Sequence, residues 1–189
     1  MLETILPWII GGIIVLVLIG IVFWYFGTYN RFYSLKNSSE ATLGQIRVAM
    51  KKRLDMIDQL LGAVKSYAKF EKETFEKVTA MRAAVATGGP GDLNKVEAES
   101  RSMLGRLFAV AENYPDLKTN TTVTTLMSSV KDIEDEIARQ RYTYNNISQQ
   151  FNTMMDTIPS KFVGRSTGLP KLEYLQFEEA IATAPKIEF

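Results

Sequence analysis

The chain has 189 residues, and its 22 lysine and arginine residues nearly balance its 21 aspartate and glutamate residues. This balance argues against a nucleic-acid-binding protein, which needs a clustered excess of basic residues. The chain contains no cysteine and no histidine, which excludes disulfides, the usual zinc sites, and catalysis by a cysteine or by a serine–histidine–aspartate triad.

The first predicted element is a membrane span. Residues 5–27 are apolar without interruption and carry no charge, and a helix needs about 20 such residues to cross a bilayer core. Trp8 lies at one end, and Trp24 and Tyr25 at the other, where aromatic side chains favour the membrane–water interface. A cleaved signal peptide is the alternative, but no basic residue precedes the stretch and its apolar run is too long. We therefore predict a short tail over 1–4, an uncleaved span over 5–27, and the lipid bilayer as a partner.

Basic residues around this span predict its orientation. No lysine or arginine precedes it, whereas Arg31, Lys36 and Arg47 follow it. Because cytoplasmic flanks carry the excess of basic residues, we expect the N-terminus outside and residues 28–189 in the cytoplasm. The expected location is the cell (inner, or cytoplasmic) membrane.

A long helix is predicted after the span. Residues 28–87 contain no proline, and apolar residues recur every seven positions over 43–85, as in a helix that packs lengthwise against others. We expect one helix continuous with the membrane span, with bends at Gly44 or Gly62. The breaker run 87–91 ends it.

Two further helices are predicted to return along the first. One covers about 93–113, with Asp92 as its N-cap, and it stops before Pro115, which disfavours helix in the preceding residue. The other covers about 119–157. In the alternative geometry, the proline only kinks a single helix over 92–158.

The C-terminal part is predicted to pack on these helices. Residues 160–170 read as a loop because they contain two glycines and a proline, 171–183 as a short helix, and 186–189 as an extended tail. The expected fold is all-α, an N-terminal transmembrane helix continuing into an antiparallel up-and-down bundle over 28–160. Residues 161–189 supply the loop, the short helix and the tail.

Polar residues interrupt the apolar seam of the predicted bundle. Arg53 and Glu71 occupy seam positions about 27 Å apart along a helix, so each needs a partner from another helix. Asn145 and Asn152 can share a face of the third helix with Arg141. The seam candidates are Arg53, Glu71, Glu112, Glu134, Arg141, Asn145 and Asn152. We interpret them as a buried polar layer that fixes helix register; the alternative is a ligand pocket.

The chain also resembles a known family in several segments spread along its length. These are Tyr29-Asn30 and the stretches 51–82, 111–120, 133–145 and 185–189. Their order, together with the N-terminal span, resembles the LemA family nearly from end to end. The resemblance implies a single-span prokaryotic membrane protein with a helical-bundle domain, associated with envelope stress, membrane proteases or signalling. It implies no catalytic residues.

The expected function follows from the span, the balanced charge and the long helical seam. We predict a non-enzymatic interaction or scaffold protein at the membrane, with no catalytic, cofactor-binding or metal site. Its expected partners are an unidentified membrane or cytoplasmic protein and a second copy of the chain, but not nucleic acid. The alternative is a ligand- or stress-sensing signalling module that uses a polar pocket between helices. An enzyme that relies on aspartate and glutamate alone ranks last, because the sequence shows no sheltered pair of carboxylates.

Overall fold

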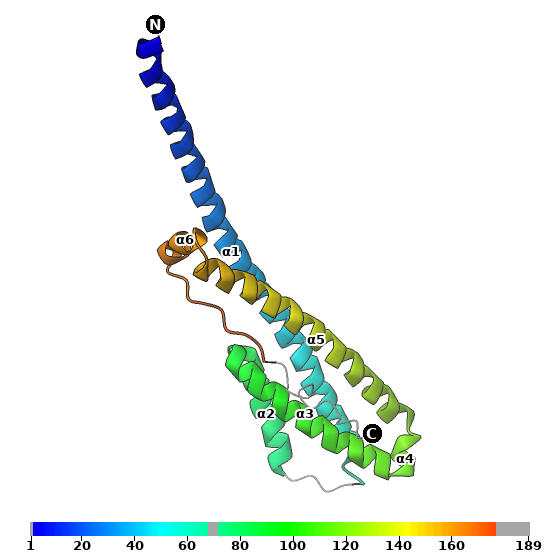
Figure 1. Cartoon of the computed structure of the whole chain (residues 1–189). Helices are drawn as coiled ribbons and strands as arrows, with labels where there is room; N and C mark the ends of the chain where they lie inside the picture. Colours follow the sequence, from blue (N-terminus) through cyan, green and yellow to red (C-terminus); the bar gives the residue numbers. More distant parts are fainter. Residues whose placement is uncertain (1, 68–71, 177–189) are drawn as a thin grey trace, which may run out of the picture. The chain divides into compact units, whose positions relative to one another are not determined.

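The computed structural model describes residues 2–67 and 72–176, and side chains from residue 5 onward. Its elements are α1 (Leu2–Val64), α2 (Lys72–Thr87), α3 (Pro90–Asn113), α4 (Pro115–Lys118), α5 (Thr121–Asp156) and α6 (Ser160–Thr167) (Figure 1). Over the described residues there is no strand, which confirms the predicted all-α fold. The chain forms two compact units. The first unit contains residues 2–39 and 147–172, and the second unit contains the described part of 40–146 and 173–176.

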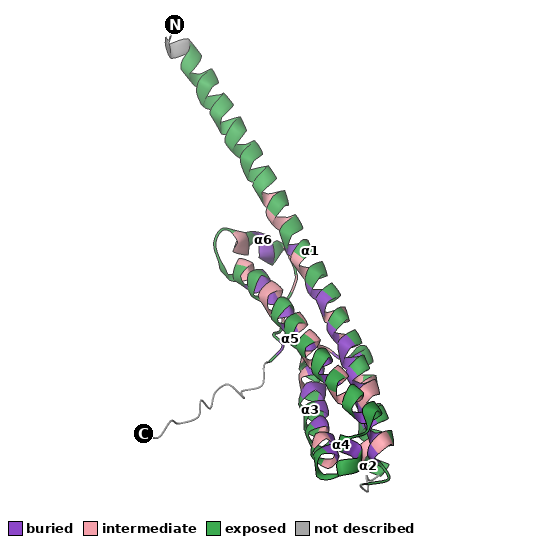
Figure 2. Ribbon diagram, turned by 90° about the vertical axis from the view of Figure 1, so that its right-hand side faces the viewer, coloured by how far each residue is buried: buried purple, intermediate pink, exposed green. Residues whose placement is uncertain are grey.

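The N-terminal part of α1 has no described part of the protein packed around it. Every side chain from 5 to 24 is exposed, on all sides of the helix (Figure 2). Within the described residues, α1 is the one helix that is long and apolar enough to cross a membrane. A stretch that is apolar all round is typical of a helix that lies in lipid.

The first unit has a small aromatic core where α1, α5 and α6 meet. Phe32 and Phe151 are fully buried and meet edge to face, with 5.4 Å between ring centroids. Gly164 permits this packing, because an added Cβ would lie 2.7 Å from the sulfur of Met155 and 2.9 Å from Phe32 Cζ. Gly168 ends α6 in the left-handed conformation, at φ 68°, which glycine adopts without strain.

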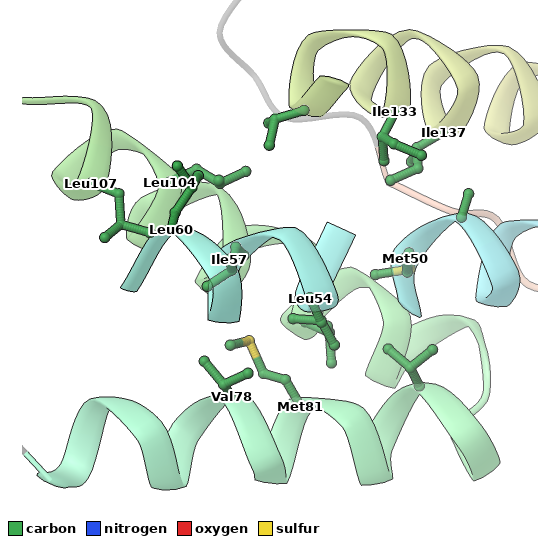
Figure 3. Packing of buried hydrophobic residues seen from close by; sticks show 14 of the residues in the cluster. Met50, Leu54, Ile57, Leu60, Val78, Met81, Leu104, Leu107, Ile133 and Ile137 are labelled. Carbon is green, nitrogen blue, oxygen red and sulfur yellow. The ribbon is translucent and has the colours of Figure 1, made fainter. Parts of the chain in front are cut away.

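In the second unit, α2 folds back along α1. Arg47 Nη2 donates to the Gly88 carbonyl at 2.7 Å, and Arg82 Nη2 donates to Asp55 Oδ1 at 2.9 Å. As the residue number increases along α1, the number of the contacted residue decreases along α2, so the two helices are antiparallel. Val78 and Met81 face the apolar side of α1 (Figure 3).

The predicted single helix over 28–87 is therefore wrong. After Val64 the helix ends in a turn, in which the Tyr67 N–H donates to the Val64 carbonyl at 2.9 Å. The next described helix, α2, is a separate element that begins at Lys72. The seven-residue repeat survives the break because α2 buries its own stripe of Val78, Met81 and Val85. An apolar repeat does not distinguish a helix that continues from one that turns back.

The connection between α2 and α3 is a tight turn. A Cβ on Gly88 would lie only 2.4 Å from the Ala84 carbonyl oxygen, so this position requires glycine. The N-cap of α3 is Gly89, and Asp92 lies in the first turn of the helix. The prediction of Asp92 as the N-cap is therefore wrong. Its carboxylate instead reaches back and accepts the Gly89 N–H at 3.3 Å, as the acidic residue of a capping box does.

A reversal at α4 brings α5 back along α3. Asn120 caps α5, since its Oδ1 accepts the N–H groups of Thr122 at 2.9 Å and Val123 at 3.2 Å. Arg101 pairs with Glu134, which places the two helices antiparallel within the second unit. The alternative of one kinked helix over 92–158 is therefore wrong.

The C-terminal region departs from the prediction. Helix α6 occupies residues where a loop was expected, and residues 169–176 are non-helical. Its two glycines serve close packing and termination rather than a loop. The prediction of a helix over 171–183 is wrong over 171–176, where asparagine side chains form hydrogen bonds with the main-chain N–H and carbonyl groups of the segment. The remainder of that prediction, and the tail over 186–189, lie outside the described residues.

Candidate functional site

The guanidinium of Arg53 is fully buried in the second unit. Its side chain is 0% exposed, on the inward face of α1. Nη1 donates to Glu97 Oε2 at 2.9 Å and to Ser100 Oγ at 3.0 Å, both on α3. Nη2 forms an ion pair with Glu134 on α5. One arginine thus ties three helices together.

Two more arginines close the network around the carboxylates. Glu97 Oε1 accepts from Arg141 Nη1 on α5 and from Arg101 Nη2 on α3, each at 3.0 Å. Arg101 Nη2 also lies 3.6 Å from Glu134 Oε2. The charge cluster, as we call it, comprises Arg53, Glu97, Ser100, Arg101, Glu134 and Arg141.

Glu97 is ionised at the centre of this cluster. Burial alone would raise the pKa of its carboxyl, but the guanidinium of Arg53, and then that of Arg141, outweigh burial and hold the pKa below its usual value. A carboxylate with a lowered pKa is a weak proton acceptor. The arrangement suits a structural ion-pair network rather than a general base.

The structure brings three of the predicted seam residues together and places the other described ones outside that group. Arg53, Glu134 and Arg141 meet in the charge cluster. Glu112 is exposed and lies outside the cluster, because it falls on the outer face of α3. Glu71 lies outside the described residues.

Sequence analysis missed Glu97, Ser100 and Arg101. The signal was present, because the inward-facing row of α3 runs through Leu93, Glu97, Ser100, Leu104 and Leu107 at alternating spacings of four and three. Two polar residues within such a row predict a buried polar contact.

Asn145 and Asn152 have a different role from the charge cluster. In the second unit, Asn145 Nδ2 donates to the Leu175 carbonyl at 2.7 Å and its Oδ1 accepts the Leu175 N–H at 2.9 Å. In the first unit, Asn152 does the same with Leu172, at 2.8 and 2.9 Å. Each amide supplies the donor and the acceptor that a neighbouring strand would offer. We call these contacts the asparagine clamps.

The three predicted interface aromatics lie in different surroundings. Trp8 is 82% exposed and Trp24 is 41% exposed. Tyr25 is half-buried against the aromatic core of the first unit, and its hydroxyl lies 2.9 Å from Ser166 Oγ on α6. The side chain of Tyr25 therefore also connects α1 to α6.

A cavity of about 410 Å³ lies between α2 and α3 in the second unit. Its lining residues are Thr74, Lys77, Met81, Ala98, Glu99, Ser102, Met103 and Arg106. No member of the charge cluster lines it. Over the residues that the structure describes, no three metal-ligating side chains of the histidine, cysteine or acidic types come together.

Known proteins resemble this chain over most of its length. The model of the LemA family matches residues 42–189. Protein LemA of Metamycoplasma hominis is 27% identical over 164 residues, which cover 85% of this chain and 75% of that protein. Magnetosome protein MamQ 2 of Paramagnetospirillum magneticum is 24% identical over 179 residues, covering 80% of this chain and 66% of its own length. Magnetosome protein MamQ of Magnetospirillum gryphiswaldense is 23% identical over the same coverage. None of these names denotes an enzyme.

Proposed function

This chain belongs to the LemA family, and from that premise we propose that it is a single-span membrane protein whose helical domain acts as a non-enzymatic interaction, or scaffold, protein. The observation that carries the proposal is the change in character along α1. Its side chains are apolar and exposed over 5–24, and the same helix is packed into a polar-surfaced bundle further on. A surface of exposed isoleucine, leucine and valine on every side of a helix favours lipid as its surroundings.

The buried polar groups support a structural role for the bundle interior. Both carboxylates of the charge cluster are already bound by arginines, so they contribute to helix register instead of offering reactive groups. The working part of such a protein is then its outer surface. Tyr142 on α5 is 64% exposed, and exposed tyrosines are enriched where proteins bind one another.

We propose the cytoplasm as the compartment of residues 28–189. Arg31, Lys36 and Arg47 follow the span and no basic residue precedes it. A reporter that is active only outside the cytoplasm, fused after Phe189, should be silent. A strong signal from that fusion would reverse the proposed orientation and move the partners to the opposite side.

The partner is proposed to be a membrane or cytoplasmic protein, or a second copy of the chain. A photo-reactive phenylalanine analogue at Tyr142, introduced in the full chain in native membranes, should give discrete protein adducts. Mass spectrometry of those adducts distinguishes a second copy from another protein. The matched control is the same substitution in a chain that lacks residues 1–27, where adducts that require the membrane should disappear. No adduct at Tyr142, Val48 or Phe75, all exposed in the second unit, would contradict the scaffold proposal.

The structure argues against a ligand-sensing pocket among the seam residues. Arg53 is fully enclosed, and its guanidinium is held by Glu97 and Glu134. The cavity of the second unit lies elsewhere, between α2 and α3. A ligand that entered the seam would have to displace buried ion pairs, which typically costs several kcal/mol.

A further inference from the structure

Helix α6 is attached to α1 at the end of the apolar stretch. Its Val163 is 1% exposed and Gly164 packs against Phe32, while Ser166 Oγ lies 2.9 Å from the hydroxyl of Tyr25. Figures 1 and 2 both show α6 beside α1, just beyond the fully exposed part of that helix. Within the first unit, these contacts place α6 where the span would leave the membrane.

Two large apolar side chains, one in α6 and one just before it, are mostly exposed. Phe162 is 63% exposed, and Ile158, just before the helix, is 74% exposed. Phe162 lies four residues before Ser166, so both belong to one face of the helix. Ser166 contacts Tyr25, close to the C-terminal end of the apolar stretch, so that face lies near the end of the span.

Basic side chains accompany these apolar residues. Lys161 and Arg165 belong to α6, and neither forms an ion pair with any part of the chain that the structure describes. The first unit as a whole is basic. Over 28–39 and 147–172, five basic residues face a single acidic residue, and that residue, Asp156, is paired with Lys171 at 2.8 Å. In contrast, 40–146 and 173–189 together hold 17 basic and 19 acidic residues.

We propose that α6 is an interfacial helix that docks on an anionic phospholipid surface. Phe162 and Ile158 insert at the boundary between headgroups and acyl chains, and Lys161 and Arg165 bind lipid phosphates. Lipid is the occupant because the Tyr25–Ser166 contact holds α6 at the end of the span, so the bilayer is in reach without rearrangement. The inference rests on the proposed membrane span, and it gives the chain a second attachment to lipid.

The first test measures where position 162 lies. The chain has no cysteine, so a single Phe162→Cys substitution can carry a spin label in the full chain, reconstituted singly into phosphatidylcholine–phosphatidylglycerol nanodiscs. We expect the label to be relaxed more by oxygen, which concentrates in lipid, than by a water-soluble nickel chelate. Tyr142→Cys is the matched control, because Tyr142 is 64% exposed and belongs to the second unit; its label should respond to nickel. A label at 162 that responds to nickel as the control does would overturn the proposal and favour a protein partner on α6.

The second test measures the preference for anionic lipid. Spin-labelled phosphatidylglycerol should associate with the full chain more strongly than spin-labelled phosphatidylcholine, by up to about fivefold for each engaged charge. The double variant Lys161→Gln/Arg165→Gln should lose most of this preference, whereas Lys131→Gln, an exposed substitution in the second unit, should keep it. An unchanged preference in the double variant would contradict the assignment of these two side chains.

Flotation separates this inference from the proposed function. A full chain that does not float with vesicles would end both the membrane span and the docking of α6. A chain that floats, but whose position 162 is exposed to water, would leave the span intact and refute only the interfacial helix.

Discussion

The N-terminal and C-terminal parts of α1 show opposite relations between the polarity of a side chain and its exposure. Over 5–24 the exposed side chains are apolar, whereas further along the same helix the largest fully buried side chain is an arginine, Arg53. In each case the surroundings decide the residue, because lipid accepts an apolar exterior and two carboxylates accept a buried guanidinium. Exposure therefore does not require a polar side chain, and burial does not require an apolar one, where the surroundings compensate. Deleting the apolar stretch tests the first part of the helix, and substituting members of the charge cluster tests the second.

The largest expected effect comes from deleting residues 1–27. Only Glu3 among the 43 charged residues lies in the deleted part, and the remaining helices bury their apolar residues on one side. We expect most of the truncated chain to move from the membrane pellet to the soluble fraction, because the proposed docking of α6 is only a weak and reversible attachment. Its circular dichroism should remain mostly helical. A spectrum of coil, or persistent sedimentation with membranes, would show that the bundle depends on the span or carries another strong attachment.

The next effect concerns Arg53. We expect Arg53→Ala to lower the free energy of unfolding of the soluble fragment by about 3–5 kcal/mol, because it leaves buried carboxylates short of a partner. Chemical denaturation measures the loss. Lys72→Ala is the control, because the side chain of Lys72 is 91% exposed where it pairs with Glu76. The unfolding midpoint of this variant should not shift. A wild-type midpoint for Arg53→Ala would mean that the other two arginines suffice.

A smaller effect is expected from the charge on Glu97. The pKa of this group is lowered in the folded state, so its ionised form stabilises the protein above the ordinary glutamate pKa of about 4.3. That stability is lost as the pH falls through the lower, folded-state pKa. Glu97→Gln should therefore cost about 1.5–3 kcal/mol at pH 7.

The difference between wild type and Glu97→Gln should begin to shrink as the pH falls below the ordinary glutamate pKa of about 4.3, and it should be lost once the pH passes the lower pKa of the folded state, where the wild-type carboxyl is protonated as well. Denaturation at a series of pH values measures this. Glu112→Gln provides the comparison, because Glu112 is exposed on α3. If the difference in unfolding free energy between wild type and Glu97→Gln stayed constant down to acid pH, Glu97 would stabilise the protein through its packing rather than through its charge.

The smallest of these effects comes from a neutral polar contact. Asn152→Ala removes two hydrogen bonds to Leu172, and we expect a cost of about 1–3 kcal/mol. Gln150→Ala, an exposed change two residues away, should be close to neutral. Hydrogen exchange at the Leu172 amide should rise in Asn152→Ala only. Unchanged protection of that amide would show that packing, rather than the amide, holds the segment.

Sequence patterns predicted those elements whose ends are marked by particular residues. Pro115 marks the end of α3, and Gly88, Gly89 and Pro90 mark the turn that precedes its start. The break after Val64 was not predictable, because no glycine or proline stands at 65–67 and the apolar repeat continues on the returning helix. Helix α6 was missed because a glycine that serves close packing reads, in sequence, as a loop residue.

The candidate site was predictable in part, for a related reason. Arg53 stood out as a charge at an apolar position, and Glu134 and Arg141 were among the other predicted members of the polar seam. Glu97, which binds Arg53 and Arg141 together, was not found. Pairing between helices depends on their relative register, and that register is set by the loops and the break after α1, which the apolar repeat does not encode. The resemblance to the LemA family was confirmed by the match over 42–189.

The asparagine clamps bear on how this sequence can drift over evolutionary time. Each carboxamide contacts only the main-chain N–H and carbonyl of Leu172 or Leu175, groups that every residue except proline offers. Aspartate lacks the donor and glutamine is one methylene too long, so substitution at the two clamps is tightly restricted. The half-buried side chain of Leu172 packs against the aromatic core of the first unit, but another apolar side chain at this position would keep the same main-chain attachment. Related chains should therefore preserve the asparagines more strictly than the residues that the asparagines hold.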